Sequence, residues 1–132
     1  MKLFRPVGTK ELELIRQSGM RKFPPRLPEQ PIFYPALNVA YARQIAREWN
    51  TKSAPGFAGF VTEFEVDDHY GLKFEVKTVG SSMHKELWVP AEELEEFNRY
   101  IVGDIRVIEA YYGENYQGMK EDVRREVHEK AI

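Results

Sequence analysis

The sequence predicts a single mixed α+β domain. Its first third alternates short strands with helices, and the part that follows consists mostly of strands separated by turns. An early α/β portion followed by a run of strands is typical of α+β folds and not of doubly wound parallel sheets. A chain of 132 residues has room for one hydrophobic core and not for two. Because no internal repeat is present, we expect residues 1–132 to form one domain.

The composition is that of an ordinary globular protein, and it argues against several kinds of site. Hydrophobic residues make up 42% and charged residues 30% of the chain, with a formal net charge of -2. Such a chain has no overall cationic field that would hold a nucleic-acid backbone. The absence of cysteine excludes disulfides and thiolate metal sites. The three histidines are dispersed, so no metal site is predicted.

The sequence also bears on the location of the protein. No stretch approaches the about 20 consecutive apolar residues of a membrane-spanning helix. The first twelve residues, MKLFRPVGTKEL, lack the apolar centre of a signal peptide. We therefore expect a cytoplasmic protein without a membrane partner.

The N-terminal segment predicts a strand, a helix and a long loop. Residues 2–7 (KLFRPV) form a short strand, and residues 9–18 follow as a helix with one apolar face. Gly19 is suited to the left-handed conformation that ends many helices. Residues 20–31 contain four prolines and little periodicity, which predicts an irregular and rigid loop. A loop of this length in so small a domain is often functional.

A second strand and a second helix come next. Residues 32–34 (IFY) form a short apolar strand that Pro35 ends, and Asn38 is a good N-cap. Apolar residues behind this cap follow the i, i+3, i+4, i+7 spacing of a buried helix face, namely Ala42, Ile45, Ala46 and Trp49. This is the strongest helix signal in the chain.

The remaining sequence predicts strands, one short helix and a C-terminal helix. We expect strands at 60–66, 73–79, 83–89 and 101–111, a turn at 80–82 and an acidic helix at 91–97. Within 60–66 the alternation is clean, and a bend is expected at Gly103. A charged peripheral helix is expected at about 117–131.

Three motifs in this order point to a family. The first is LFRPV (3–7), followed by a helix and a Ser-Gly pair, and the second is IFY (32–34), immediately before a helix. The third is KELWVP (85–90), a strand that carries a glutamate. Together they resemble ADP-ribosyltransferase-like domains. The segments FPPRLPEQPIFYP and ELWVPAEELEEFN also resemble a family of small bacterial proteins labelled as ADP-ribosylation/crystallin J1-like, over nearly the whole chain.

The resemblance implies both a fold and an activity. The implied fold is a split mixed or antiparallel β-sheet with two early helices and a peripheral C-terminal helix. The implied activity is that of an NAD⁺-dependent ADP-ribosyltransferase, or of an NAD glycohydrolase, that cleaves the nicotinamide–ribose bond. The acceptor of ADP-ribose stays open between protein, nucleic acid, small molecule and water.

The chemistry of this cleavage needs three kinds of side chain. The bond breaks through an oxocarbenium-like centre, which a nearby carboxylate stabilises. By the resemblance, Glu86 is this catalytic carboxylate, and Arg5 holds the ribose and phosphates of NAD⁺ with its guanidinium. Tyr34 offers its ring to the nicotinamide, with Phe33 as the alternative in strand register. Arg26, in the proline-rich loop, is a further candidate for the diphosphate.

Each of these residues also has an interpretation without function. Arg5 can belong to a surface ion pair, and Phe33 and Tyr34 can simply pack in the core. Glu86 can be an exposed strand residue, and Arg26 a solvated loop residue. For Phe33 and Arg26 we favour these interpretations.

Two positions depart from the family pattern and leave other functions open. Val7 cannot donate the hydrogen bond of the Ser or Thr that stands there in related families. His84 replaces the Gln or Glu that orients the acceptor, and we take it as a second catalytic candidate because a histidine can act as base or donor near neutral pH. These departures favour, as an alternative, a non-enzymatic module that binds a nucleotide or ADP-ribose. The sparse apolar face of the C-terminal helix allows a protein-interaction domain, antitoxin or phage-related.

Overall fold

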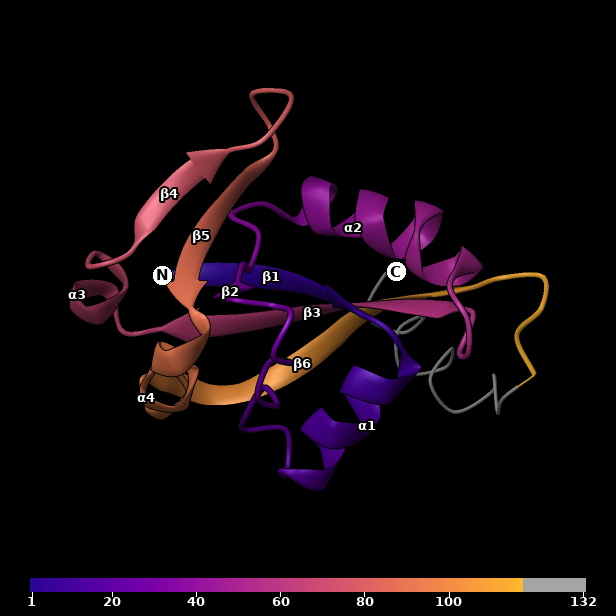
Figure 1. Cartoon of the computed structure of the whole chain (residues 1–132), viewed down its shortest axis with the longest axis horizontal. Helices are drawn as coiled ribbons and strands as arrows, with labels where there is room; N and C mark the ends of the chain where they lie inside the picture. Colours follow the sequence, from indigo (N-terminus) through magenta and orange to yellow (C-terminus); the bar gives the residue numbers. More distant parts are fainter. Residues whose placement is uncertain (118–132) are drawn as a thin grey trace.

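The computed structural model, which describes residues 1–117, contains two three-stranded antiparallel sheets (Figure 1). The first sheet holds, in spatial order, β1 (Lys2–Val7), β3 (Ala58–Val66) and β6 (Ile101–Tyr112). The second sheet holds β2 (Ile32–Phe33), β5 (Lys85–Pro90) and β4 (Glu75–Thr78). Helices accompany both sheets, so the prediction of a mixed α+β fold is confirmed.

The segment 35–37, which continues from β2, joins the two sheets. Ala36 forms one isolated antiparallel bridge with Phe4 on β1 and another with Glu86 on β5. The Phe4 amide donates to the Ala36 carbonyl at 2.9 Å, and the Ala36 amide donates to the Phe4 carbonyl at 2.6 Å. Pro35 has no amide hydrogen to extend this pairing. The strand order across the junction is therefore β4, β5, segment 35–37, β1, β3, β6.

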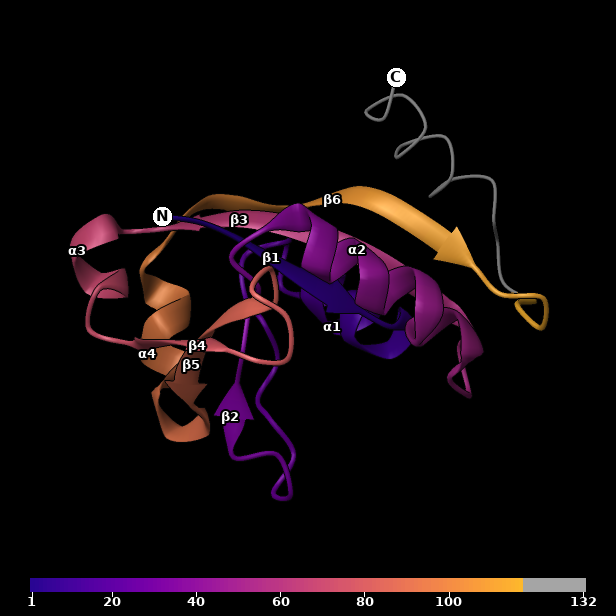
Figure 2. The ribbon, with the colours of Figure 1, turned by 90° about the horizontal axis from the view of Figure 1, so that it is seen from above.

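Two helices flank β1 on opposite faces of the first sheet. Figure 1 shows α2 (Val39–Glu48) above β1 and β3, and α1 (Thr9–Gln17) below them. Phe4 packs with α2, whereas its neighbour Leu3 belongs to the larger core cluster that includes α1. Successive strand residues point to opposite faces, which explains this division. Figure 2 shows β3 and β6 along one side of the molecule, with the helices and the second sheet on the other.

Helix α2 packs closely against the first sheet because the residues at the contact are small. Ala42 and Ala46 are fully buried, and a Cβ atom at Gly59 of β3 would lie only 2.3 Å from the Ala46 carbonyl oxygen. Trp49, predicted to share this buried face, is instead 59% exposed, because the helix ends before it. The close approach of helix and strand leaves room for alanine but not for larger side chains.

Several local signals act as the sequence predicts. The Asn38 side chain accepts a hydrogen bond from the Tyr41 amide at 2.8 Å and caps α2. Gly19, after α1, has a φ of +77°, and Gly103, at a bend in β6, has a φ of +78°. These positive values are readily adopted by glycine.

Other segments differ from the prediction. Between β3 and β4 the structure has a short helix that was not predicted, α3 (Asp68–Gly71). Asp67 caps the N-terminus of this helix. The predicted acidic helix begins as a 3-10 turn, η2 (Ala91–Glu93), and continues as α4 (Leu94–Arg99). A further 3-10 turn, η1 (Asn50–Lys52), lies in the connection before β3.

The proline-rich loop is irregular, as predicted, but it is firmly anchored. Phe23 is 2% exposed and packs against Phe33 and Phe64, with ring centroids 5.1 and 4.8 Å away. The Asn98 side chain accepts a hydrogen bond from the Phe23 amide at 2.9 Å and donates one to the Phe23 carbonyl at 3.0 Å. This anchor places the residues that follow, including Arg26, beside β1 and β2.

The C-terminal helix expected at about 117–131 lies, apart from Gln117, outside the described residues. Among residues 1–117, none of the helices has the length and apolar character needed to cross a membrane.

Candidate functional site

Glu86 is a buried carboxylate at the junction of the two sheets. Its side chain lies on β5, directly opposite Ala36 on one side and Lys77 of β4 on the other. The residue is only 5% exposed. Burial raises the pKa of Glu86, and a hydrogen bond from the Trp88 side chain opposes this shift. A carboxylate in such surroundings is a candidate for stabilising positive charge.

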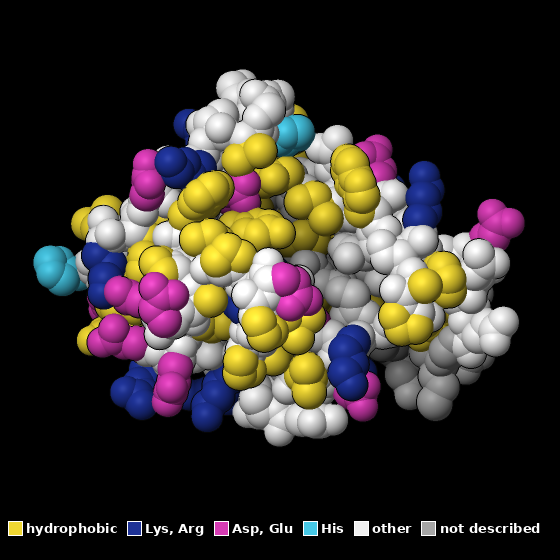
Figure 3. All heavy atoms as spheres, in the orientation of Figure 1, with side chains coloured by type: hydrophobic (Ala, Val, Ile, Leu, Met, Phe, Trp, Pro, Cys, Tyr) yellow, Lys and Arg dark blue, Asp and Glu magenta, His cyan; other side chains and the backbone are white. Residues whose placement is uncertain are grey.

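Two aromatic residues share a face of the sheet with Glu86, and a third faces them from α2. The pairing of Phe33 with Val89 continues to Tyr34 opposite Trp88, and directly opposite residues of antiparallel strands share a face. Tyr41 faces these residues from α2. The pKa of Tyr41 is raised, mainly because the side chain is buried and further because of the charges of Glu86 and Tyr34. Figure 3 shows hydrophobic side chains gathered between β5 and α2.

Tyr34 and Phe33 have different environments. Tyr34 lies just beyond the end of β2 and is 45% exposed, so its ring is accessible from solution. Phe33 is 1% exposed and belongs to the main core cluster. Of the two register alternatives, the structure therefore places Tyr34 beside Glu86.

Arg5 points to the other face of the sheet. Its neighbour Phe4 shares a face with Ala36, so the Arg5 side chain turns away from it, and its guanidinium carbon lies 4.7 Å from the centre of the Phe33 ring. Two of its nitrogens donate to the Glu11 carboxylate, at 2.6 and 3.0 Å. Arg5 is 7% exposed, whereas the Glu11 side chain is 23% exposed, so this ion pair is partly buried and not a surface pair. The structure does not bring Arg5 and Glu86 onto one face.

Arg26 lies between Tyr34 and the Arg5–Glu11 pair. Its Nε donates to the Ile32 carbonyl at 3.1 Å, and its guanidinium carbon lies 5.6 Å from the centre of the Tyr34 ring. Burial and the neighbouring charge of Arg5 lower the pKa of Arg26, while Glu11 and Tyr34 act in the opposite direction. Arg26 is half-buried between Tyr34 and the Arg5–Glu11 pair, and not freely solvated.

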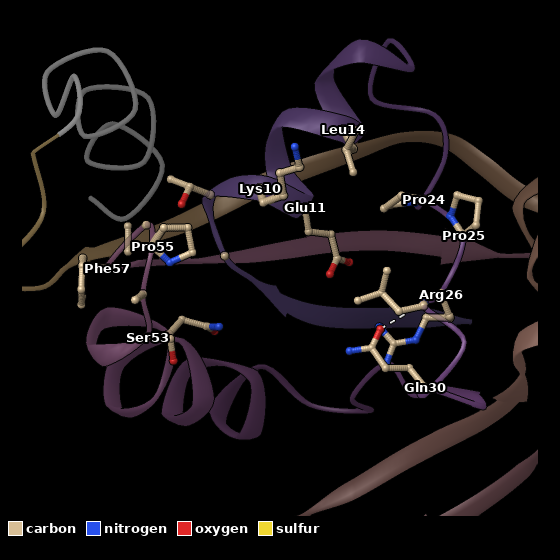
Figure 4. A pocket seen from close by; sticks show the side chains of 17 residues that line it. Lys10, Glu11, Leu14, Pro24, Pro25, Arg26, Gln30, Ser53, Pro55 and Phe57 are labelled. Carbon is tan, nitrogen blue, oxygen red and sulfur yellow. Dashed lines mark hydrogen bonds between the residues drawn. The ribbon is translucent and has the colours of Figure 1, made fainter.

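A hollow of about 480 Å³ lies next to Arg26 and Glu11. It is bounded by the start of α1, the loop residues 24–30 and the connection 50–58. Figure 4 shows Glu11 pointing into this hollow, with Arg26 on one side and Ser53 across from it. The volume lies within the range of small-molecule sites, and much of the lining is proline and other apolar side chains.

His84 precedes β5 and is engaged by its neighbours. Its Nδ1 lies 3.1 Å from the Val79 carbonyl oxygen, and its Nε2 lies 3.0 Å from Oε1 of Gln44 on α2. The imidazole also stacks on the Tyr41 ring, with centroids 4.6 Å apart and 21° between the planes. His84 is therefore near Glu86 in sequence but is held between the hairpin and α2.

Sequence reasoning did not identify Tyr41, Glu11, Gln44 or Lys77. The available signal for Tyr41 and Glu11 was their place in the first turn of a helix that directly follows a strand segment of the site. Lys77 could have been found only from the register of β4 with β5.

No group of three or more acidic or histidine side chains within residues 1–117 is arranged to hold a metal ion. In the Asp-Asp-His sequence, Asp67 accepts a hydrogen bond from the Tyr70 amide, and Asp68 pairs with the N-terminal amine. The pair Arg43–Glu109 on the far side of α2 is a structural ion pair at 2.6 Å.

The chain finds no match among family models, curated proteins or solved structures.

Proposed function

We propose that the protein binds NAD⁺ and cleaves its nicotinamide–ribose bond, as an ADP-ribosyltransferase or an NAD glycohydrolase. The observation that carries the proposal is the buried carboxylate of Glu86 on the same face as the exposed ring of Tyr34. Cleavage of this bond develops positive charge on the ribose. A carboxylate held in a water-poor site stabilises such charge far better than one in bulk water.

The strand order supports the same proposal. The second sheet, segment 35–37 and the first sheet form a split antiparallel arrangement with two early helices. The resemblance to ADP-ribosyltransferase-like domains implies a split sheet with two early helices, and this strand order supports that proposal. Glu86 and Tyr34 lie next to the split, where segment 35–37 joins the two sheets.

The other candidate residues are assigned to different parts of the NAD⁺ molecule. Tyr34 offers an exposed ring for the nicotinamide, and Arg26, against that ring, supplies the cation for the diphosphate. Arg5 contacts phosphate only if Glu11 releases it, so its present role is to hold Glu11 and Phe33 in position. We assign the hollow beside Arg26 and Glu11, which neither Glu86 nor Tyr34 lines, to the part of the ligand remote from the nicotinamide.

The substitution Glu86→Gln tests the proposal. It keeps the size of the side chain and removes its charge, so we expect the rate of nicotinamide release to fall by at least about 100-fold. Binding of NAD⁺, measured by calorimetry, should stay within a few-fold of wild type. The matched control is Glu92→Gln, which alters an exposed glutamate of η2. Wild-type turnover in Glu86→Gln would contradict the assignment of Glu86.

A non-enzymatic binding module is the second candidate. It is favoured by the engagement of Arg5 with Glu11 and of His84 with Gln44, which leaves neither side chain free in this conformation. Calorimetry and nicotinamide release separate the two functions in the wild-type protein. Binding of NAD⁺ or ADP-ribose without any release selects the module, and release selects the enzyme.

A further inference from the structure

The hairpin between β4 and β5 leads directly into the strand that carries Glu86. Its turn is closed by hydrogen bonds from the Val79 amide to the His84 carbonyl at 2.8 Å and from the His84 amide to the Ser81 carbonyl at 3.0 Å. The residues between them are exposed. The position of this turn therefore determines where β5 begins, at Lys85, one residue before Glu86.

Side chains of α2 and its N-cap hold the hairpin in place. Gln44 Oε1 lies 3.0 Å from His84 Nε2, and the Tyr41 ring stacks on the imidazole. Asn38 donates from its side-chain amide to the Met83 carbonyl, while its oxygen caps α2 by accepting from the Tyr41 amide. One asparagine thus fixes both the start of the helix and the base of the hairpin.

These contacts supplement a narrow connection between the two sheets. The bridges between the sheets that the described residues form run through Ala36 alone. On the β5 side the Leu37 amide donates to the Lys85 carbonyl and the Leu87 amide donates to the Pro35 carbonyl, both at 2.9 Å, and residues of both sheets share the main core cluster. The contacts of the hairpin with α2 add a further attachment near Glu86, because α2 is itself packed on the first sheet.

We propose that His84 is a positioning residue that clamps the β4–β5 hairpin to α2 and so holds Glu86 beside Tyr41. Both of its ring nitrogens lie at hydrogen-bonding distance from oxygen atoms of the protein, Val79 O and Gln44 Oε1. A general base needs a ring nitrogen directed at the reacting group. While the clamp is closed, both ring nitrogens of His84 face oxygen atoms of the protein, so neither is directed at a reacting group.

The space around the imidazole agrees with this role. A Cβ atom at Gly80 would lie 3.3 Å from His84 Nδ1, and Gly80 itself has a φ of +80°. The turn thus folds tightly over one edge of the ring, while Tyr41 covers a face of it. The clamp is a matter of structure alone, and only its effect on turnover rests on the proposed function.

The test compares two variants that open the clamp from opposite sides. His84→Ala removes the ring, and Gln44→Leu removes its partner while the imidazole stays. We expect hydrogen exchange of the amides in 79–87 to become about tenfold faster in both, because each loses a hydrogen bond or a stacking contact. His69→Ala, an exposed histidine on α3, is the matched control and should leave this exchange unchanged. Unchanged exchange in both clamp variants would overturn the proposal.

Kinetics of nicotinamide release provide the second arm. A displaced Glu86 should lower kcat in both clamp variants by a similar factor, with KM for NAD⁺ little changed because Tyr34 and Arg26 are untouched. Loss of turnover in His84→Ala together with wild-type turnover in Gln44→Leu would identify His84 as a catalytic base and overturn the clamp. If the wild-type protein releases no nicotinamide, the proposed function fails, and the exchange experiment still decides the clamp.

Discussion

At the scale of single residues, Glu86 and Arg5 are both buried ionisable side chains, but they differ in whether a charge of opposite sign lies beside them. Arg5 shares its burial with Glu11, which accepts two hydrogen bonds from it, so the charges compensate each other. Glu86 has a raised pKa because its carboxylate is removed from water. Lys77, although opposite Glu86, is drawn to Glu75 at 3.0 Å and lies over the Trp88 ring. An uncompensated carboxylate costs stability and is characteristic of functional sites.

The raised pKa of Glu86 predicts a pH-dependent stability difference for Glu86→Gln. The Glu86 carboxyl binds its proton more tightly in the folded than in the unfolded protein. The protein therefore loses stability as the pH rises from 4.5, the ordinary pKa of a glutamate, through the higher pKa of Glu86 in the folded state. The variant lacks this loss, so its free energy of unfolding should rise relative to that of the wild type across this pH interval. Above the interval the difference between the two free energies should stay constant. Urea unfolding at several pH values measures the difference. A difference that does not vary with pH would contradict the raised pKa.

The two arginines predict different phenotypes. Arg5→Ala leaves the Glu11 carboxylate without its partner and uncovers Phe33, so we expect a loss of about 2–4 kcal/mol in the free energy of unfolding. Arg26→Ala removes a half-exposed contact with the Tyr34 ring, so it should cost less than about 1 kcal/mol in the free energy of unfolding but weaken NAD⁺ binding several-fold. Urea unfolding and calorimetry on both variants separate the roles. Strong loss of NAD⁺ affinity in a stably folded Arg5→Ala protein would show instead that Arg5 contacts the ligand.

At the scale of the elements, α2 is the part on which the site depends most. Its buried face rests on β1 and β3, and its outer residues Tyr41 and Gln44 reach the hairpin. The small side chains of Ala42 and Ala46 set the distance between this helix and the sheet. A shift of α2 would therefore move one wall of the site relative to Glu86.

Gly59→Ala tests this dependence on the position of α2. The new Cβ atom would lie 2.3 Å from the Ala46 carbonyl oxygen, a backbone atom that can move only with the helix. We expect a destabilisation of about 2–3 kcal/mol in urea unfolding, as for other overpacked cores. Gly8→Ala is the comparison, because its Cβ would meet the Ala58 carbonyl oxygen at an ordinary 4.0 Å. A similar small cost, under about 1 kcal/mol, in both variants would contradict the close packing.

At the scale of the whole molecule, the two sheets and their junction create the candidate site. The aromatic residues come from segment 32–34, from α2 and from β5, which are separate in the sequence and meet only because segment 35–37 lies between β1 and β5. The proline-rich loop, which is anchored through Phe23, places Arg26 beside segment 32–34. The hollow of about 480 Å³ lies between the start of α1, the proline-rich loop and the connection before β3.

Local sequence was sufficient to predict most strands and helices, the Asn38 cap and the bend at Gly103, because these depend on periodicity and on the backbone preferences of single residues. It also identified Glu86 and Tyr34 as candidates that prove to share a face. The opposite orientation of Arg5, the clamp at His84 and the exposure of Trp49 depend on strand register and on where α2 packs. Register couples residues far apart in the chain, and a one-residue shift moves a side chain to the other face of a sheet. That information becomes available only when the strands are paired.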